Sequence, residues 1–144
     1  MKKNRRKFSN TILANKFSQF GGRCAYCGTP LTWERKKPNS VEFDHINPIS
    51  CGGADTEENL LAACHICNYE KNDFRINEFR DYIQRLYKNN IEYPKMWFKF
   101  FKQLGVIEVK PWDGVFLFEK EGFTPNTELD GRNISDKNYW ERML

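Results

Sequence analysis

Four of the five cysteines in this 144-residue chain form two Cys-x-x-Cys pairs, Cys24 with Cys27 and Cys64 with Cys67. Each pair can present two thiolates from one tight turn, and four thiolates are the ligand set of a closed, tetrahedral structural zinc site. Residues 28–63 lie between the pairs, a longer interval than in short zinc ribbons. The interval must therefore be a structural unit whose ends the zinc holds together, with a binding free energy on the order of 10 kcal/mol.

Other interpretations of the cysteines stay open at this point. The pairs could be redox motifs or unlinked core cysteines, although a redox motif needs no second copy facing it. His65, inside the second pair, could replace one sulfur ligand. Cys51 stands in a Ser-Cys-Gly-Gly loop and is interpreted as an ordinary free cysteine.

Four polar residues between and just after the pairs are the candidates for chemistry: Asp44, His45, Asn59 and Asn68. From Glu42 to Lys71 the sequence runs Glu-Phe-Asp-His-Ile-x-Pro-x3-Gly-Gly-x2-Thr-x-Glu-Asn-Leu-x2-Ala-Cys-x2-Cys-Asn-x2-Lys. This pattern closely resembles the HNH endonucleases, whose fold is the ββα-metal motif. The resemblance runs from Cys24 to about Phe79 and does not extend to residues 90–144.

The resemblance implies hydrolysis of DNA, as a nick or a double-strand break, leaving 5′-phosphate and 3′-hydroxyl ends. Such hydrolysis needs a nucleophilic water and a cation that neutralises charge developing on the phosphate. A neutral imidazole can take a proton from water near neutral pH, so we expect His45 to be the general base. Mg²⁺ or Mn²⁺ prefers oxygen ligands, for which Asp44 and the side-chain carbonyl of Asn68 are suited.

Three details of this expected site depend on its local sequence. Neighbouring strand residues point to opposite faces, so Asp44 and His45 can serve one site only if the strand ends or bends there, as the turn at Pro48 makes plausible. The resemblance assigns Asn59 to bracing the loop after the first strand. The third motif position, often histidine in the family, is Asn68 here, which favours a hard metal over zinc.

Hydrophobic periodicity predicts the elements that position these residues. Two short strands are expected, at 41–45 and 60–63. Helices are expected at 8–20, 76–89 and 96–104, the first ended by Gly21 and Gly22 and the last preceded by Pro94 and ended by Gly105.

The C-terminal part is predicted to contain a β-hairpin, with strands at 106–110 and 115–120 around the turn Pro-Trp-Asp-Gly at 111–114. The last twenty or so residues show no period. We expect an extended arm packed by Trp140 and Leu144, or partial disorder.

The composition, with 40% hydrophobic residues, allows one compact unit with small appendages. The predicted fold class is α+β: a ββα-metal core with a four-cysteine structural zinc, an N-terminal helix, and a C-terminal helix plus β-hairpin. The expected divisions are a basic arm and helix at 1–22, the nuclease core at 23–75, and C-terminal helices, hairpin and tail at 76–144. No signal peptide or membrane-spanning stretch is predicted, so a cytoplasmic location is expected.

The positive charge is mild overall, at +4, but clustered. One cluster is Arg35-Lys36-Lys37 and the other is at the N-terminus, at Lys2, Lys3, Arg5, Arg6 and Lys7. Such clusters suit phosphate contacts with double-stranded DNA, although the N-terminal one could instead be a frayed, solvated tail. Lys71 is expected either to contact phosphate or to cap a helix end.

Two other functions compete with the nuclease. One is a catalytically silent nucleic-acid-binding or scaffolding module that keeps the zinc fold. The other is a protein-interaction domain in which a set of aromatic residues is exposed and makes a homodimer contact, although such a stripe is more typical of a core: Trp97, Phe98, Phe100, Phe101 and Phe116.

Overall fold

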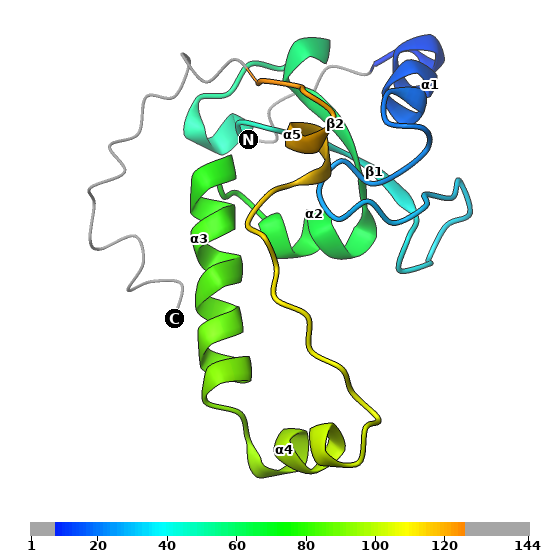
Figure 1. The fold of residues 1–144 in the computed structure, drawn as a ribbon. Coiled ribbons are helices and arrows are strands. Elements are labelled where there is room, and N and C mark those ends of the chain that lie inside the picture. The colour runs from blue at the N-terminus through cyan, green and yellow to red at the C-terminus, as the bar shows by residue number, and fades with distance from the viewer. Residues whose placement is uncertain (1–7, 126–144) are drawn as a thin grey trace.

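The computed structural model describes residues 8–125 (Figure 1). The basic residues 2–7 and the predicted contacts of Trp140 and Leu144 lie outside this range. The helices and strands, in chain order, are α1 (Asn10–Ser18), β1 (Val41–His45), β2 (Leu60–Cys64), α2 (His65–Lys71), α3 (Ile76–Tyr87), α4 (Met96–Gln103) and α5 (Leu117–Lys120). Single 3₁₀ turns occupy Ile49–Cys51 and Glu57–Asn59, and a π-helical turn, Lys88–Glu92, follows α3.

A two-stranded antiparallel sheet is the centre of the fold. β1 pairs with β2 in a register that sets Val41 opposite Cys64 and His45 opposite Leu60. All five residues of β2 are buried, because this apolar strand packs against both α1 and α2. The two predicted strands are therefore confirmed, and the fold is α+β.

The predicted helices are also found, with shorter bounds. The Ser9 hydroxyl caps α1 by accepting from the Ile12 N–H at 3.3 Å, and Gly21 and Gly22 end the segment with φ of 67° and 71°. α3 is amphipathic and buries Ile76 and Phe79 against the body of the protein.

Aromatic rings from three distant parts of the chain form the core beside the sheet. Tyr26 lies edge-on to Phe79, with ring centroids 5.7 Å apart, and Phe79 stacks on Phe116 at 5.4 Å. Phe118 stacks in turn on Phe116 at 5.8 Å. Contacts of this kind contribute about 0.5–1.5 kcal/mol per pair beyond the burial of their area. They join the first cysteine turn, α3 and α5.

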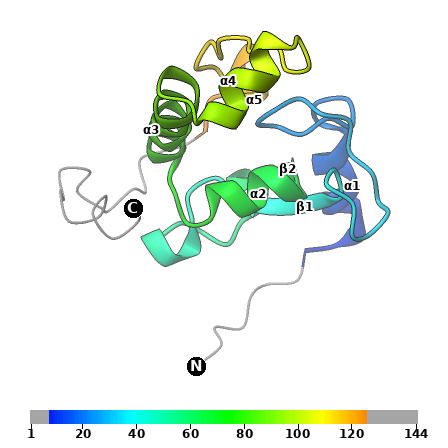
Figure 2. The same cartoon turned by 90° about the horizontal axis from the view of Figure 1, so that it is seen from below.

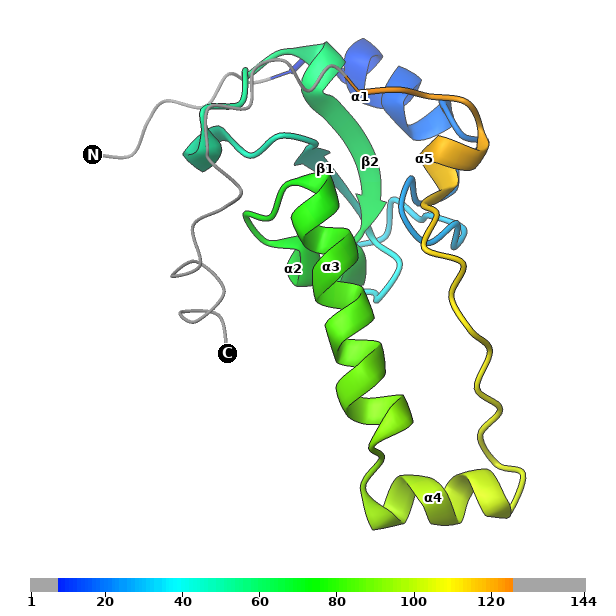
Figure 3. The same cartoon turned by 60° about the vertical axis from the view of Figure 1, so that its left-hand side comes forward.

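The predicted C-terminal β-hairpin is wrong. Within residues 8–125, the segment 106–116 is an extended connection without a partner strand, and residues 117–120 form α5 (Figure 3). The carboxylate of Glu119 accepts from the Phe116 N–H at 2.9 Å and so begins a helix where a strand was expected.

The apolar run at 115–118 has a different cause from strand pairing. Phe116 and Phe118 are buried in the aromatic core, while Val115 is exposed. The N–H groups of Leu117 and Phe118 donate to the carbonyls of Tyr26 and Ala25, at 3.1 and 2.8 Å. The segment therefore hydrogen-bonds to the first cysteine turn.

α4 stands apart from the body. α3 runs away from the sheet, α4 lies at its far end, and residues 105–116 return to α5 (Figures 1 and 3). The expectation that its aromatic residues are core is wrong for Trp97, Phe100 and Phe101, which are exposed, whereas Phe116 is buried. None of the helices in the described range is both long and apolar enough to cross a membrane.

Candidate metal centre and adjacent cavity

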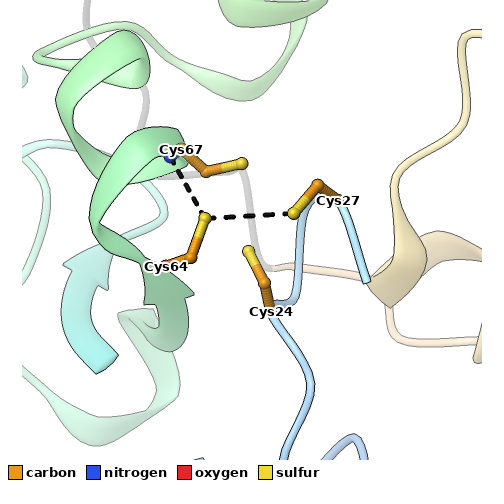
Figure 4. Close-up of side chains that lie close together, drawn as sticks. All are labelled: Cys24, Cys27, Cys64 and Cys67. Carbon is orange, nitrogen blue, oxygen red and sulfur yellow. Dashed lines mark hydrogen bonds between the residues drawn. The ribbon is translucent and has the colours of Figure 1, made fainter. Parts of the chain in front are cut away.

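The four paired cysteines converge on one point. The Sγ atoms of Cys24, Cys27, Cys64 and Cys67 all lie within 4.8 Å of one another, two from the first turn and two from the end of β2 and the start of α2 (Figure 4). A tetrahedron with Zn–S bonds of about 2.3 Å has sulfur–sulfur edges of about 3.8 Å. The distance of 3.9 Å between the sulfurs of Cys27 and Cys64 matches that edge. The cluster therefore fits a structural zinc ion.

Backbone geometry fixes each pair of sulfurs. In the first turn the Gly28 N–H donates to the Cys24 carbonyl at 2.9 Å, and Gly28 has a φ of 77°, which glycine adopts without strain. In the second, the Cys67 N–H donates to the sulfur of Cys64 at 3.3 Å. The Ala25 N–H donates to the Ala62 carbonyl at 3.0 Å and ties the first turn to β2.

Crowding of the four sulfurs shifts their proton affinities in opposite directions. Hydrogen bonds from the thiols of Cys27, Cys64 and Cys67 lower the pKa of Cys24 far below its ordinary value. Hydrogen bonds within the same group raise the pKa of Cys67 far above it. A divalent cation bound between the four sulfurs would release the thiol protons, because metals bind cysteine as the thiolate.

His65 and Cys51 lie outside this cluster. The Nδ1 of His65 is 3.0 Å from the carboxylate of Glu42. The sulfur of Cys51 donates to the Asp73 carbonyl at 3.3 Å. Neither residue takes the place of a paired cysteine in the four-sulfur group.

α2 lies against β1, and three residues spaced three apart on the helix meet two acidic residues of the strand: His65 and Asn68 contact Glu42, and Lys71 contacts Asp44. Glu42 and Asp44 share one face of the strand, and His65, Asn68 and Lys71 follow one another along one side of the helix. Glu42 accepts from the Nδ2 of Asn68 at 3.0 Å. Because the amide nitrogen is fixed on Glu42, the carbonyl oxygen of Asn68 is directed elsewhere and is available as a ligand.

Asp44 is held by two buried groups. Its Oδ2 accepts from the Tyr26 hydroxyl at 2.5 Å and from the Lys71 ammonium at 2.9 Å. Lys71 is fully buried and also donates to the His45 carbonyl at 3.0 Å. Burial, reinforced by the charge of Asp44, raises the pKa of the Tyr26 hydroxyl, so Tyr26 stays a neutral donor. The expected phosphate contact of Lys71 is therefore wrong; the residue does stand at the C-terminal end of α2.

The end of β1 opens into a polar cavity of about 290 Å³. Asp44, His45 and Asn68 share it, so the strand end does bring the adjacent aspartate and histidine to one site. The full lining is Phe43, Asp44, His45, Pro48, Ile49, Ser50, Asn68, Asn72 and Asp73. Carboxylate and amide oxygens gathered in this way are the donor set that Mg²⁺ and Mn²⁺ prefer.

His45 has a carboxylate partner that the sequence pattern does not reveal. Its Nε2 lies 2.8 Å from the Oδ1 of Asp55, with 16% of the histidine side chain exposed. A carboxylate only accepts, so the proton of a neutral imidazole sits on Nε2 and the lone pair on Nδ1. This is the tautomer in which Nδ1 can act as a base.

Asn59 connects the two ends of the loop that carries Asp55. Its Oδ1 accepts from the Asn47 N–H at 2.9 Å, and its Nδ2 donates to the carbonyls of Asn47 and Ala54, each at 2.8 Å. Within the same loop, the backbone at Gly53 passes so close to Asn47 that a Cβ on Gly53 would lie 1.8 Å from the Asn47 carbonyl oxygen. Only glycine fits at that position. Asn59 does not itself line the cavity.

Three residues of this region were missed by the sequence argument or assigned other roles: Tyr26, Asp55 and Lys71. Each acts across a long stretch of chain or out of a loop, where spacing carries no signal. For Asp55 the sequence offered one indication: the residue directly follows Gly-Gly-Ala in the loop after His45.

Comparison with known proteins finds relatives of this segment. A family model described as HNH endonuclease matches residues 24–74. Over 50 residues, the chain is 46% identical to the CRISPR-associated endonuclease Cas9 of Corynebacterium diphtheriae. That match covers 34% of this chain and only 4% of the relative's length. The segment matched by the family model contains the four clustered cysteines and the residues expected for chemistry: Asp44, His45, Asn59 and Asn68.

Proposed function

Because residues 24–74 are an HNH endonuclease domain, we propose that the chain is a metal-dependent nuclease that hydrolyses phosphodiester bonds of double-stranded DNA. The observation that carries the proposal is the shared cavity at the end of β1, where His45 lies beside the oxygen donors of Asp44 and Asn68. These are the groups that hydrolysis of a phosphodiester requires in one place.

His45 is the general base in this mechanism. Asp55 holds the proton on Nε2, so that Nδ1 accepts a proton from the attacking water. As the proton moves to Nδ1, the Asp55 carboxylate stabilises the imidazolium that forms. A positioned base of this kind contributes about 10²- to 10⁴-fold to a rate.

Asp44 and Asn68 would hold the catalytic divalent metal, Mg²⁺ or Mn²⁺. Such a cation, when bound, neutralises charge on the phosphate and on the departing oxygen. Tyr26 and Lys71 both engage the Oδ2 of Asp44, and among the described residues no hydrogen bond reaches its Oδ1. Glu42 orients the Asn68 amide in a similar way. These partners position one oxygen of each residue as a ligand.

The cluster of Cys24, Cys27, Cys64 and Cys67 would hold zinc as a structural ion. A closed four-sulfur site leaves no open position for a water or a substrate, so its contribution is shape. It fixes the end of β2 and the start of α2 against the first turn, and α2 carries Asn68 and Lys71. The four cysteines, with zinc bound, would thereby position the residues of the cavity, and the ion itself would take no part in the reaction.

A basic and aromatic loop that leads into β1 suits contact with the DNA backbone. Arg35, Lys36 and Lys37 are exposed, and Trp33, 56% exposed, stacks on Phe17 with ring centroids 4.8 Å apart. Trp33 also lies 6.0 Å from Phe43, which lines the cavity. Lysine and arginine side chains at such a position neutralise phosphates without reading sequence.

An end-labelled DNA duplex tests the proposed reaction. Wild-type protein with Mg²⁺ or Mn²⁺ should release fragments that carry 5′-phosphate and 3′-hydroxyl ends, and EDTA should stop the release. His45→Ala should lose cleavage, whereas His65→Ala is the matched control because it removes the only other histidine and lies outside the cavity. Binding of the duplex without cleavage under any metal would replace the nuclease with a silent binding module.

A further inference from the structure

α4 carries an apolar face that is open to solvent. Five residues of one face are 40–78% exposed: Met96, Trp97, Phe100, Phe101 and Leu104. Helical spacing places Lys95, Lys99 and Lys102 together on the opposite side. The helix is therefore strongly amphipathic, yet its apolar side faces water.

No other element in residues 8–125 covers this face. The aromatic contacts found for α4 join its own rings: Trp97 with Phe98 at 5.7 Å, Trp97 with Phe101 at 5.9 Å, and Phe100 with Phe101 at 6.2 Å. In the side view α4 lies at the far end of α3 from the sheet (Figure 3), and in the view from below it does not lie over the strands (Figure 2). Its rings make no contribution to the core of the described chain.

The uncovered surface has the size of one half of a protein interface. Tyr93 and Val106, 71% and 70% exposed, are further apolar residues just before and just after the helix. At about 100 Å² of exposed area for each large side chain, the seven residues together expose about 700 Å², close to the ~800 Å² per partner of a standard interface. Monomeric proteins rarely leave a larger apolar patch in water than this.

We propose that α4 pairs with the α4 of a second copy of this chain, apolar face to apolar face. The face contains no charged side chain, so an identical partner buries no charge against it. The three lysines stay in solvent on the outer side of each helix. A DNA duplex would bind the lysine side and leave the aromatic side in water, so DNA does not account for the apolar face.

Such a pair is symmetric and closed. Each apolar face is occupied by its counterpart, which limits the assembly to two copies. Because the pairing does not depend on the nuclease reaction, it can be tested on the full-length His45→Ala protein, and its failure leaves the proposed catalysis untouched.

Sedimentation velocity over a concentration series tests the pairing. We expect the full-length His45→Ala protein, which is the starting protein for the further variants, to be a dimer at micromolar concentration. Trp97→Ser combined with Phe100→Ser should weaken the dimer by at least about 30-fold, the loss expected for one aromatic anchor of an interface. Lys99→Ser combined with Lys102→Ser is the matched control and should sediment as the starting protein does. Far-ultraviolet circular dichroism and zinc content verify that each variant is folded.

Three results would overturn the proposal. One is a monomer up to concentrations on the order of 100 µM. Another is a dimer that the aromatic variant leaves intact. The third is a monomer that floats with anionic lipid vesicles and loses this binding in the aromatic variant, which would assign the face to a membrane surface.

Discussion

The Nε2 of His45 and the Oδ1 of Asp55 lie 2.8 Å apart, although ten positions separate these residues in the chain. The contact closes the loop that follows β1, and Asn59 holds the two sides of that loop together. It also fixes which imidazole nitrogen is free. The proposed base and its carboxylate partner are thus brought together by a loop conformation rather than by one regular element.

Asp55→Asn should lower the maximal cleavage rate by about 10²-fold or more, because an asparagine amide can donate to Nε2 and so favour the wrong tautomer. The magnesium concentration at half-maximal rate should stay unchanged, since Asp55 binds no metal in this mechanism. Single-turnover cleavage at several magnesium concentrations measures both. Partial recovery in Asp55→Glu would support a positioning role, and wild-type rates in Asp55→Asn would exclude one.

Lys71→Met should destabilise the protein by about 3–5 kcal/mol, because it leaves the Asp44 carboxylate buried without its cation. Urea unfolding of the zinc-loaded protein measures this loss. Lys37→Met, at an exposed site, is the control and should stay within about 0.5 kcal/mol of wild type. Equal stability of the Lys71 variant and wild type would show that the buried ion pair does not hold β1 to α2.

Cys27→Ser should reduce zinc content and lower the melting temperature, because the fold of a small zinc module depends on its metal. Cys51→Ser is the matched control, since Cys51 is a cysteine outside the four-sulfur group. Metal analysis after dialysis should find one zinc per chain in wild type and in Cys51→Ser. Retention of that zinc by Cys27→Ser would contradict the proposed ligand set.

Glu119 gives stability a defined dependence on pH. Burial raises the pKa of its carboxyl. Hydrogen bonds from Arg80 and from the Phe116 N–H lower that pKa by more than burial raises it, so the pKa lies below the ordinary value of 4.5. The stabilisation of the fold by the charged Glu119 carboxylate is therefore complete above about pH 4.5, and it is lost as the pH falls through the folded-state pKa of Glu119. Urea unfolding of wild type and Glu119→Gln should show a stability gap at pH 7 that narrows below pH 4.5. A gap independent of pH would contradict this account.

The parts of the structure that the sequence predicts are those with local signals. The cysteine pairs, the alternation of β1, the apolar run of β2 and the helical periods of α1, α3 and α4 all reflect residues close in the chain. The apolar run 115–118 misled, because two phenylalanines buried beside a helix cap on Glu119 give the same β-favouring composition as a strand. Lys71 and Asp55 could not be assigned, because their partners are set by how α2 and the loop pack.

A magnesium titration of plasmid nicking under single-turnover conditions tests the central claim most directly, because it separates the base from the metal ligands. We predict that His45→Ala lowers the plateau rate by about 10²- to 10⁴-fold and leaves the magnesium midpoint unchanged. Asn68→Ala should instead move that midpoint to higher concentration. Nicking by His45→Ala at the wild-type rate, or nicking that needs no divalent metal, would contradict the account.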